Sequence, residues 1–280
     1  MDLLYIIWNI EPEIFPGSGI PIRWYGLLFA MAFVSAYFIM RYIFKRKKVA
    51  QKVLDDLTLY IGLGTIIGAR LGHCFFYDPA YYIANPWQIF NIAAGGLASH
   101  GAAIGIIIAV LLFHRKHKIN PIWLFDRLAI VIPLSGMFIR LGNLINSEIY
   151  GTYTELPWAF VFERSYDIAH RTEPHHPTQI YEALAYLAIF ILLFWLYRKD
   201  KLIKARGKMF GLFLILLFVA RFFIEYLKEA QVEQELIMLQ NIGMNLGQLL
   251  SIPFILLGVW FLLRKTKKDL TEKPASPLEP

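Results

Sequence analysis

Seven long apolar stretches constrain this chain more than any other feature of its sequence. They cover residues 20–44, 54–76, 97–113, 122–143, 178–197, 208–227 and 243–263. Each has close to the roughly 20 helical residues that cross a bilayer core. Most of them lack a polar face, so they must be helices, whose backbone hydrogen bonds are satisfied internally. We therefore predict an all-α membrane protein, built as a bundle of seven transmembrane helices.

The charges between these stretches alternate in sign along the chain. One set of connections is basic, at residues 45–48, 115–118, 198–208 and 264–268. The other set is neutral or acidic, and comprises the N-terminus and residues 77–96, 147–177 and 229–235. The positive-inside rule then places the N-terminus outside and the C-terminus inside. Because each basic run adjoins the end of a span, we expect no nucleic-acid partner.

The long connection between the fourth and fifth helices, residues 147–177, is predicted to form a small outer segment. Its apolar run at residues 158–162 could be a strand or an interfacial piece, and residues 87–92 could form an interfacial helix. We expect one domain over residues 1–268, with residues 269–280 as a disordered cytoplasmic tail, because that stretch is polar and contains proline.

Glycine gathers on one face of the second stretch. Gly64, Gly68 and Gly72 are spaced four residues apart, so they share a helix face. This pattern predicts close packing against another helix. The alternative is that the small residues leave room for a lipid or a peptide.

Polar side chains inside the stretches need an explanation, since a charge in hydrocarbon costs about 2.5–3.5 kcal/mol on insertion scales. In the predicted topology most of them lie near the outer ends of their spans, and only Asp126 and Arg127 lie at inner ends. An arginine fork donates two hydrogen bonds to a phosphate, so this level suits an anionic lipid headgroup. The outer set is Tyr25, Arg70, His73, His100, Arg140, Asn143, Gln179, Tyr181, Glu182, Arg221 and Glu225.

Each of these residues also has a plain structural interpretation. Arg70 could extend its charged end toward water, and Arg140 could be an interface anchor. Arg221 and Glu225, at i and i+4, could be a structural ion pair, and His100 could be a hydrogen-bonded core histidine. Their common level favours a shared site over these separate explanations.

The chain shows no obvious nucleophile of its own. Ser135 lacks the preceding glycine of a serine-protease pattern, and Cys74 has the character of a small buried apolar residue. The adjacent pair His175 and His176 lacks the H-E-x-x-H spacing of a zinc site. We predict no metal and no cofactor.

Residues 140–158, which read R-L-G-N-L-I-N-S-E-I-Y-G-T-Y-T-E-L-P-W, resemble the defining motif of the bacterial prolipoprotein diacylglyceryl transferases, approximately G-R-x-G-N-F-x-N-x-E-x-x-G-x-x-T-x-x-P-W. Residues 23–26, 95–101, 176–182 and 221–226 resemble other family segments in the same order, so the likeness covers nearly the whole chain. The departures from the family pattern are Ala102, Ile139, Leu144 and Leu217.

This resemblance implies a transferase of the bacterial cytoplasmic (inner) membrane, with several spans and an active site near the outer face. It would move the diacylglyceryl group of phosphatidylglycerol to the lipobox cysteine of a prolipoprotein signal peptide. The products would be a thioether and glycerol 1-phosphate. The partners would be these two substrates and membrane lipid. The nucleophile would then arrive on the substrate.

The resemblance also implies roles for individual residues. The catalytic set is His100, Arg140, Arg221 and Glu225. The two arginines would stabilise the phosphate leaving group, His100 would be the general base toward the thiol, and Glu225 would position Arg221 or be an alternative base. The substrate-binding set is Tyr25, Arg140, Asn143, Glu148, Gly151, Gln179 and Glu182. Arg70 receives no role.

Two other functions remain open at this point. A transporter or channel would place charge near the midplane and would usually have repeated halves. A lipid-binding scaffold would use the same headgroup site without catalysis.

Overall fold

The structure, a computed structural model, describes residues 5–19, 22–91, 95–228 and 243–265. Seven helices in these ranges are long and apolar enough to cross a membrane, which confirms the predicted fold class. The chain divides into two compact units. Unit 1 is Met1–Phe38 with Asp126–Leu270, and unit 2 is Ile39–Phe125 with Thr271–Pro280. The acidic connection at 229–235 and the tail at 269–280 lie outside the described residues.

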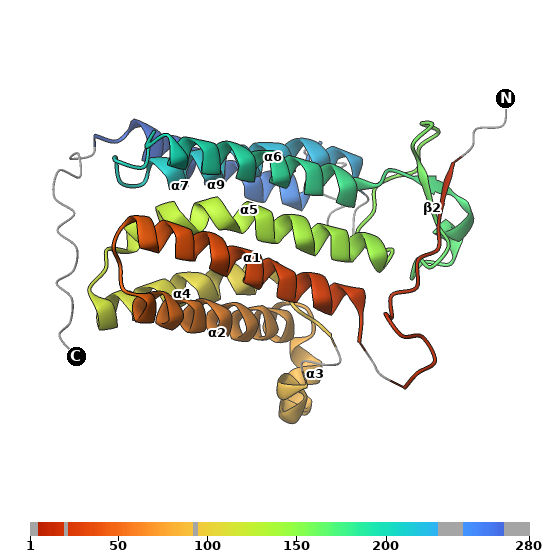
Figure 1. Cartoon of the computed structure of the whole chain (residues 1–280). Helices are drawn as coiled ribbons and strands as arrows, with labels where there is room; N and C mark the ends of the chain where they lie inside the picture. The colour runs from red at the N-terminus through yellow and green to blue at the C-terminus, as the bar shows by residue number, and fades with distance from the viewer. Residues whose placement is uncertain (1–4, 20–21, 92–94, 229–242, 266–280) are drawn as a thin grey trace. The chain divides into compact units, whose positions relative to one another are not determined.

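Unit 1 is a set of helices that run side by side (Figure 1). They are the first part of α1 (Trp24–Arg46), most of α5 (Pro121–Ile145), and α6 (Thr178–Arg198), α7 (Lys208–Ile224) and α9 (Leu246–Leu263). Asp126 accepts the backbone N–H groups of Gly207 at 2.7 Å and of Phe210 at 2.9 Å, so a buried carboxylate fixes the start of α7. The start of α9 is a capping box made by Asn245 and Gln248.

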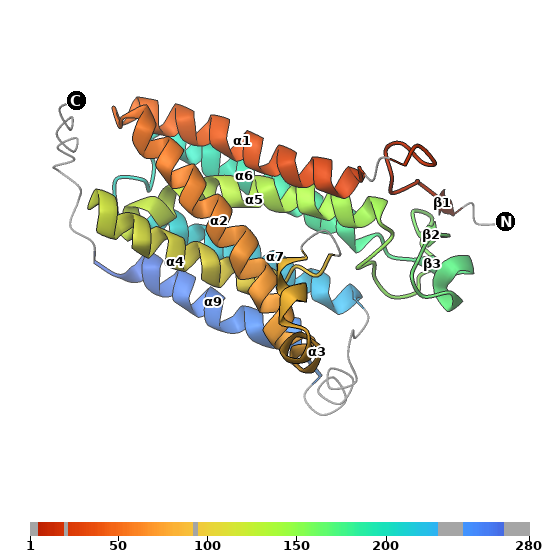
Figure 2. The ribbon, with the colours of Figure 1, turned by 90° about the horizontal axis from the view of Figure 1, so that it is seen from below.

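The predicted outer segment carries a small sheet beyond the ends of α5 and α6 (Figures 1 and 2). Its central strand β2 (Phe160–Phe162) pairs in parallel with β1 (Ile6–Trp8) and antiparallel with β3 (Pro174–His175). The strand alternative for residues 158–162 is therefore confirmed. We call residues 147–177 together with β1 the head segment.

The head segment is tied to α5 through β1. The Trp8 side chain packs on a cluster formed by Leu144, Phe160 and Phe162. Its indole Nε1 also donates to the backbone oxygen of Leu144, at 2.7 Å. The sequence interpretation did not include β1, because a strand of three residues has no visible period.

Unit 2 is built on the pair α2 (Gln51–Phe76) and α4 (Ser99–His117), which lie side by side (Figure 2). Gly64, Gly68 and Gly72 on α2 face Gly101 and Gly105 on α4. A Cβ atom built on Gly68 would lie 2.9 Å from the Cα atom of Gly105. The close packing predicted from the glycine spacing is confirmed.

The connection between α2 and α4 contains α3 (Pro79–Ala84) and the 3-10 helix η1 (Pro86–Phe90). The predicted interfacial helix at 87–92 overlaps η1, although its last residue lies outside the described residues. Arg70 is only 4% exposed, and its guanidinium donates to the backbone oxygens of Gln88, Ile89, Gly95 and Gly96. The idea that Arg70 extends toward water is wrong, because its N–H groups hold this connection in place.

Candidate functional site

Polar side chains from several helices of unit 1 meet at the end that carries the head segment. α5 contributes Arg140 and Asn143 from its last turns, and α6 contributes Gln179 and Glu182 from its first two turns. Arg221 lies in the last turn of α7, and Glu225 follows the helix as its C-cap. Residues that the sequence places far apart are therefore neighbours, as the predicted common level requires.

Glu182 is the centre of this network, and its side chain is fully buried. Its Oε2 atom lies 2.8 Å from Nε of Arg140. Its Oε1 atom lies 3.1 Å from Nζ of Lys228 and accepts the Tyr186 hydroxyl at 3.4 Å. A carboxylate enclosed in this way holds other side chains and does not face solvent.

Lys228 joins the two halves of the network. Its Nζ atom also lies 3.4 Å from Oε2 of Glu225, and its side chain is only 6% exposed. Arg221 completes the series, with Nε 3.8 Å from the same Glu225 oxygen. Arg140 and Arg221 are thus linked through Glu182, Lys228 and Glu225. The structure supports neither a placement of the two arginines on opposite sides of the bundle nor an isolated Arg221–Glu225 pair.

The sequence interpretation missed Lys228, because a lysine just after an apolar stretch is usually an interface anchor. The spacing of Lys228 from the two preceding charged residues was the signal that could have identified it. Lys228 follows Glu225 by three residues and Arg221 by seven, and on a helix these positions share one face.

The two arginines are held to different degrees. Arg140 uses Nε for Glu182 and donates from Nη1 to Oδ1 of Asn143 at 3.2 Å. The 3.8 Å separation between Arg221 and Glu225 is longer than a hydrogen bond. Arg221 is also the more exposed side chain, at 26% against 16% for Arg140. Arg140 is therefore fixed in place, while Arg221 is held loosely.

A second branch leads from Arg140 to the head segment. Asn143 donates from Nδ2 to Oε1 of Glu148 at 2.8 Å, and Gln179 donates from Nε2 to the backbone oxygen of Glu148 at 2.8 Å. The Tyr25 ring lies against Gly142, where a Cβ atom would come 2.7 Å from Cδ2 of the ring. This places four of the predicted substrate-binding residues around Arg140: Tyr25, Asn143, Glu148 and Gln179.

Gly151 has a backbone role. Its N–H donates to the oxygen of His176 at 2.8 Å, and Thr152 donates to the oxygen of Leu227 at 2.8 Å. A Cβ atom at Gly151 would collide with that same Leu227 oxygen. The glycine lets the head segment reach the end of α7, next to Lys228.

The start of α9 covers Glu225 from the other side. Asn245 donates from Nδ2 to the backbone oxygen of Glu225 at 3.0 Å. A Cβ atom built on Gly247 would lie 2.5 Å from Cδ and 2.6 Å from Oε1 of Glu225. The sequence interpretation did not include Gly247, since it lies in an apolar stretch and carries no polar atom in its side chain.

Three buried oxygen atoms near Glu148 make no hydrogen bond within the described part of the chain: Oδ1 of Asn146, Oγ of Ser147 and Oε1 of Gln179. Amide oxygens accept hydrogen bonds only, while a serine hydroxyl can also donate. Buried polar atoms normally have partners. Within the described residues, these three atoms are therefore unsatisfied hydrogen-bonding groups beside Glu148.

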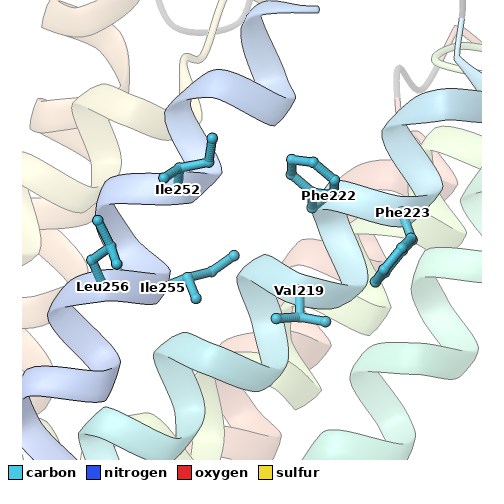
Figure 3. Close-up of a pocket in the computed structure, with 6 residues that line it drawn as sticks. All are labelled: Val219, Phe222, Phe223, Ile252, Ile255 and Leu256. Atoms are coloured by element: carbon cyan, nitrogen blue, oxygen red, sulfur yellow. The ribbon is translucent and has the colours of Figure 1, made fainter. Parts of the chain in front are cut away.

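An apolar groove lies beside the network, between α7 and α9 (Figure 3). Its volume is about 330 Å³. Phe222 and Phe223 in its wall directly follow Arg221 in the sequence. The other lining residues are Val219, Ile252, Ile255 and Leu256. The six lining side chains are all apolar, so an aliphatic chain suits this lining.

His100 belongs to unit 2, where it is exposed in the first turn of α4. The geometry of unit 1 does not test its predicted role as a general base, which therefore stays a prediction.

The model of the family described as "Prolipoprotein diacylglyceryl transferase" matches residues 12–264. Three relatives named phosphatidylglycerol–prolipoprotein diacylglyceryl transferase are similar over nearly their whole length. The protein from Porphyromonas gingivalis is 46% identical over 96% of this chain and 98% of its own length. The protein from Tolumonas auensis is 46% identical over 94% of this chain and 98% of its own. The protein from Chloroherpeton thalassium is 40% identical over 96% of this chain and 97% of its own length.

Proposed function

Because this chain belongs to the prolipoprotein diacylglyceryl transferase family, we propose that the network around Arg140 and Arg221 is its active site. The protein is a membrane transferase with several spans, and it moves the diacylglyceryl group of phosphatidylglycerol to a prolipoprotein. The observation that carries the proposal is the chain of contacts that links Arg140 to Arg221 through Glu182, Lys228 and Glu225.

In the proposed reaction, the lipobox cysteine sulfur attacks the carbon of the diacylglyceryl unit that is bonded to the phosphate oxygen. A carbon–sulfur bond forms and a carbon–oxygen bond breaks, which leaves a thioether and glycerol 1-phosphate. The thiol proton passes to a base or to the departing phosphate. A thiol with a pKa of about 8.5 is largely protonated at neutral pH, and His100 stays our prediction for the base.

Negative charge develops on the departing phosphate, and the two arginines would stabilise it there. Arg140 would hold one side of the phosphate while its Nε stays on Glu182. Arg221 is loosely held, so it can turn from Glu225 toward the substrate. Lys228 would remain beside Glu225 and offset its charge during that movement.

The enclosed carboxylates then have positioning roles. Glu182 is fully buried and already contacts Arg140, Lys228 and Tyr186. We therefore propose that Glu182 orients Arg140 and does not touch the substrate, which revises the role that the sequence resemblance implied. Glu225 shares its Oε2 atom between Arg221 and Lys228, an arrangement that favours positioning of Arg221 over the alternative role as a base.

The headgroup glycerol would bind beside Glu148. Phosphatidylglycerol carries two free hydroxyl groups on this glycerol, and hydroxyl groups donate hydrogen bonds. The unfilled acceptor of Gln179, together with those of Asn146 and Ser147, suits such donors. Asn143 and Tyr25 would border the phosphate. Gly151 would act indirectly, by placing the head segment against α7.

One acyl chain of the lipid would lie in the groove between α7 and α9 (Figure 3). Phe222 in its wall follows Arg221 in the sequence. The network end of unit 1 would face the outside of the bacterial inner membrane. The basic connection at 198–208 joins α6 to α7 at their other ends, and basic connections stay in the cytoplasm.

Arg140→Gln and Arg221→Gln test the leaving-group assignment. Purified variants are incubated with phosphatidylglycerol and a lipobox peptide, and the peptide mass is followed in time. Loss of one such donor costs about 10²–10³ in rate. Arg198→Gln, an exposed arginine at the end of α6, is the matched control and should keep its rate.

Near-normal transfer by folded Arg140→Gln or Arg221→Gln protein would show that the assignment is wrong. A wild-type protein that binds the lipid but produces no mass shift would favour the scaffold or transport functions.

A further inference from the structure

The head segment holds a second polar cluster, separate from the network around Arg140. His170, Glu173 and His175 each offer one ligand atom, and these atoms all lie within 4.8 Å of one another. We propose that this cluster binds a divalent metal ion of the zinc type and that the ion stabilises the head segment.

Local structure brings the three side chains together. His170 lies in the 3-10 helix η3 (Ala169–Thr172), and His175 ends strand β3. Glu173 is extended, with φ −104° and ψ 143°, so its side chain and that of His175 point to the same side of the strand. The turn of η3 returns His170 to that side, and the two histidine rings have centroids 4.7 Å apart.

Both histidines are oriented as metal ligands usually are. Nδ1 of His175 lies 2.9 Å from the backbone oxygen of Gly151, and Nδ1 of His170 lies 3.0 Å from the Tyr150 hydroxyl. A ligating histidine commonly gives one ring nitrogen to an oxygen of the protein and binds the metal with the other. Nε2 is then the ligand atom of each ring. The Asp167 carboxylate, 3.8 Å from Nδ1 of His170, adds outer support.

The ligand set indicates which ions would bind. Two imidazoles and one carboxylate suit zinc, with water as the fourth ligand. In a tetrahedral site the ligand atoms lie about 3.3–3.5 Å apart, so small rotations of these side chains would close the cluster. Glu173 is exposed while His175 is buried, so an ion could reach the site from solvent.

The proposed ion would stabilise the backbone that reaches the network. His175 contacts the oxygen of Gly151, and Gly151 pairs with Lys228 as an isolated bridge. The ion would have a structural role, since none of its three ligands belongs to the network itself. This proposal departs from the sequence expectation of no metal, which considered only the adjacent pair His175 and His176.

The test uses the full chain in detergent, with a purification tag that contains no histidine, after treatment with a chelator. Zn²⁺ is titrated against a competing indicator, Co²⁺ absorption reports the coordination geometry, and melting is followed with and without Zn²⁺. We expect one Zn²⁺ per chain, a higher melting temperature with Zn²⁺, and reversal by the chelator. Glu173→Gln and His170→Gln should each weaken binding at least about tenfold.

Glu155→Gln is the matched control, because Glu155 is another exposed carboxylate of the head segment. It should bind Zn²⁺ as the wild type does. The proposal is overturned if the wild type takes up no Zn²⁺ in the micromolar range, or if Glu173→Gln and His170→Gln bind it as tightly as Glu155→Gln. His175→Gln is a further variant, but the buried ring makes its folding less certain, so the other two decide.

Discussion

Replacing Lys228 by methionine tests whether the network acts as one unit. Methionine keeps most of the length of the side chain and removes its charge. The Nζ atom lies 3.1 Å from Glu182 and 3.4 Å from Glu225, and each contact is worth about 5 kcal/mol at an effective dielectric constant of 20. Desolvation of the ammonium group offsets much of this.

The net loss on removing one partner from a buried ion pair is about 3–5 kcal/mol. Solvent screening reduces this little, since the Lys228 side chain is 6% exposed. If the loss raises the activation free energy of transfer by about 3 kcal/mol, the transfer rate falls by roughly a factor of 100. The assay is the initial rate of transfer from phosphatidylglycerol to a lipobox peptide, with melting of the same samples as the test of folding.

The double variant Lys228→Met with Glu182→Gln makes the test specific. It removes two opposite charges that contact each other, so its loss should be smaller than the product of the two single losses. The expected coupling is about 1–3 kcal/mol. Lys199→Met is the control, because Lys199 is an exposed lysine just after α6. If Lys228→Met behaves like Lys199→Met, or if the two single losses simply multiply, Lys228 is only an anchor at the end of a span.

Three further predictions concern other parts of the chain. Arg70→Gln should lower the free energy of unfolding by at least about 3 kcal/mol, since it removes charged donors from buried carbonyls. Arg70→Lys should not restore this stability. A melting temperature of either variant that matches the wild type would contradict the prediction. Gly247→Ala should lower the transfer rate about tenfold or more by displacing Glu225, at a cost of about 1–3 kcal/mol in stability, and an unchanged rate would show that Glu225 has room to move. His100→Gln should remove the acidic limb of the pH–rate profile, whereas an unchanged profile would exclude His100 as the base.

The helices could be predicted because the bilayer dictates their length and composition. The stretch at 178–197 corresponds to α6 at Thr178–Arg198, with a difference of one residue. Gly64, Gly68 and Gly72 predicted close packing against another helix, and the structure identifies that helix as α4. The pairing of β1 with β2 could not be predicted, because it joins residues 6–8 to residues 160–162 and short strands have no period to detect.

Most members of the network were predictable from the sequence, and their contacts were less so. Arg140, Glu182, Arg221 and Glu225 are recognisable because charge is costly within apolar stretches. Depth along a helix does not fix the direction of a side chain, so Glu182 could not be assigned as the enclosed partner of Arg140. Lys228 and Gly247 were missed for opposite reasons. A lysine at the end of a span is common, and a glycine in a span has no polar group to notice.

The balance of charge in the network would allow it both to fold and to bind the phosphate of the proposed substrate. Arg140, Arg221 and Lys228 stand beside Glu148, Glu182 and Glu225, so three positive groups offset three negative ones before any lipid arrives. An unbalanced cluster of arginines would be costly to bury. In the proposed reaction, Lys228 would keep Glu225 paired when Arg221 turns toward the phosphate. Arg221 could then leave Glu225 for the substrate, because the buried Lys228 would remain as the partner of that carboxylate.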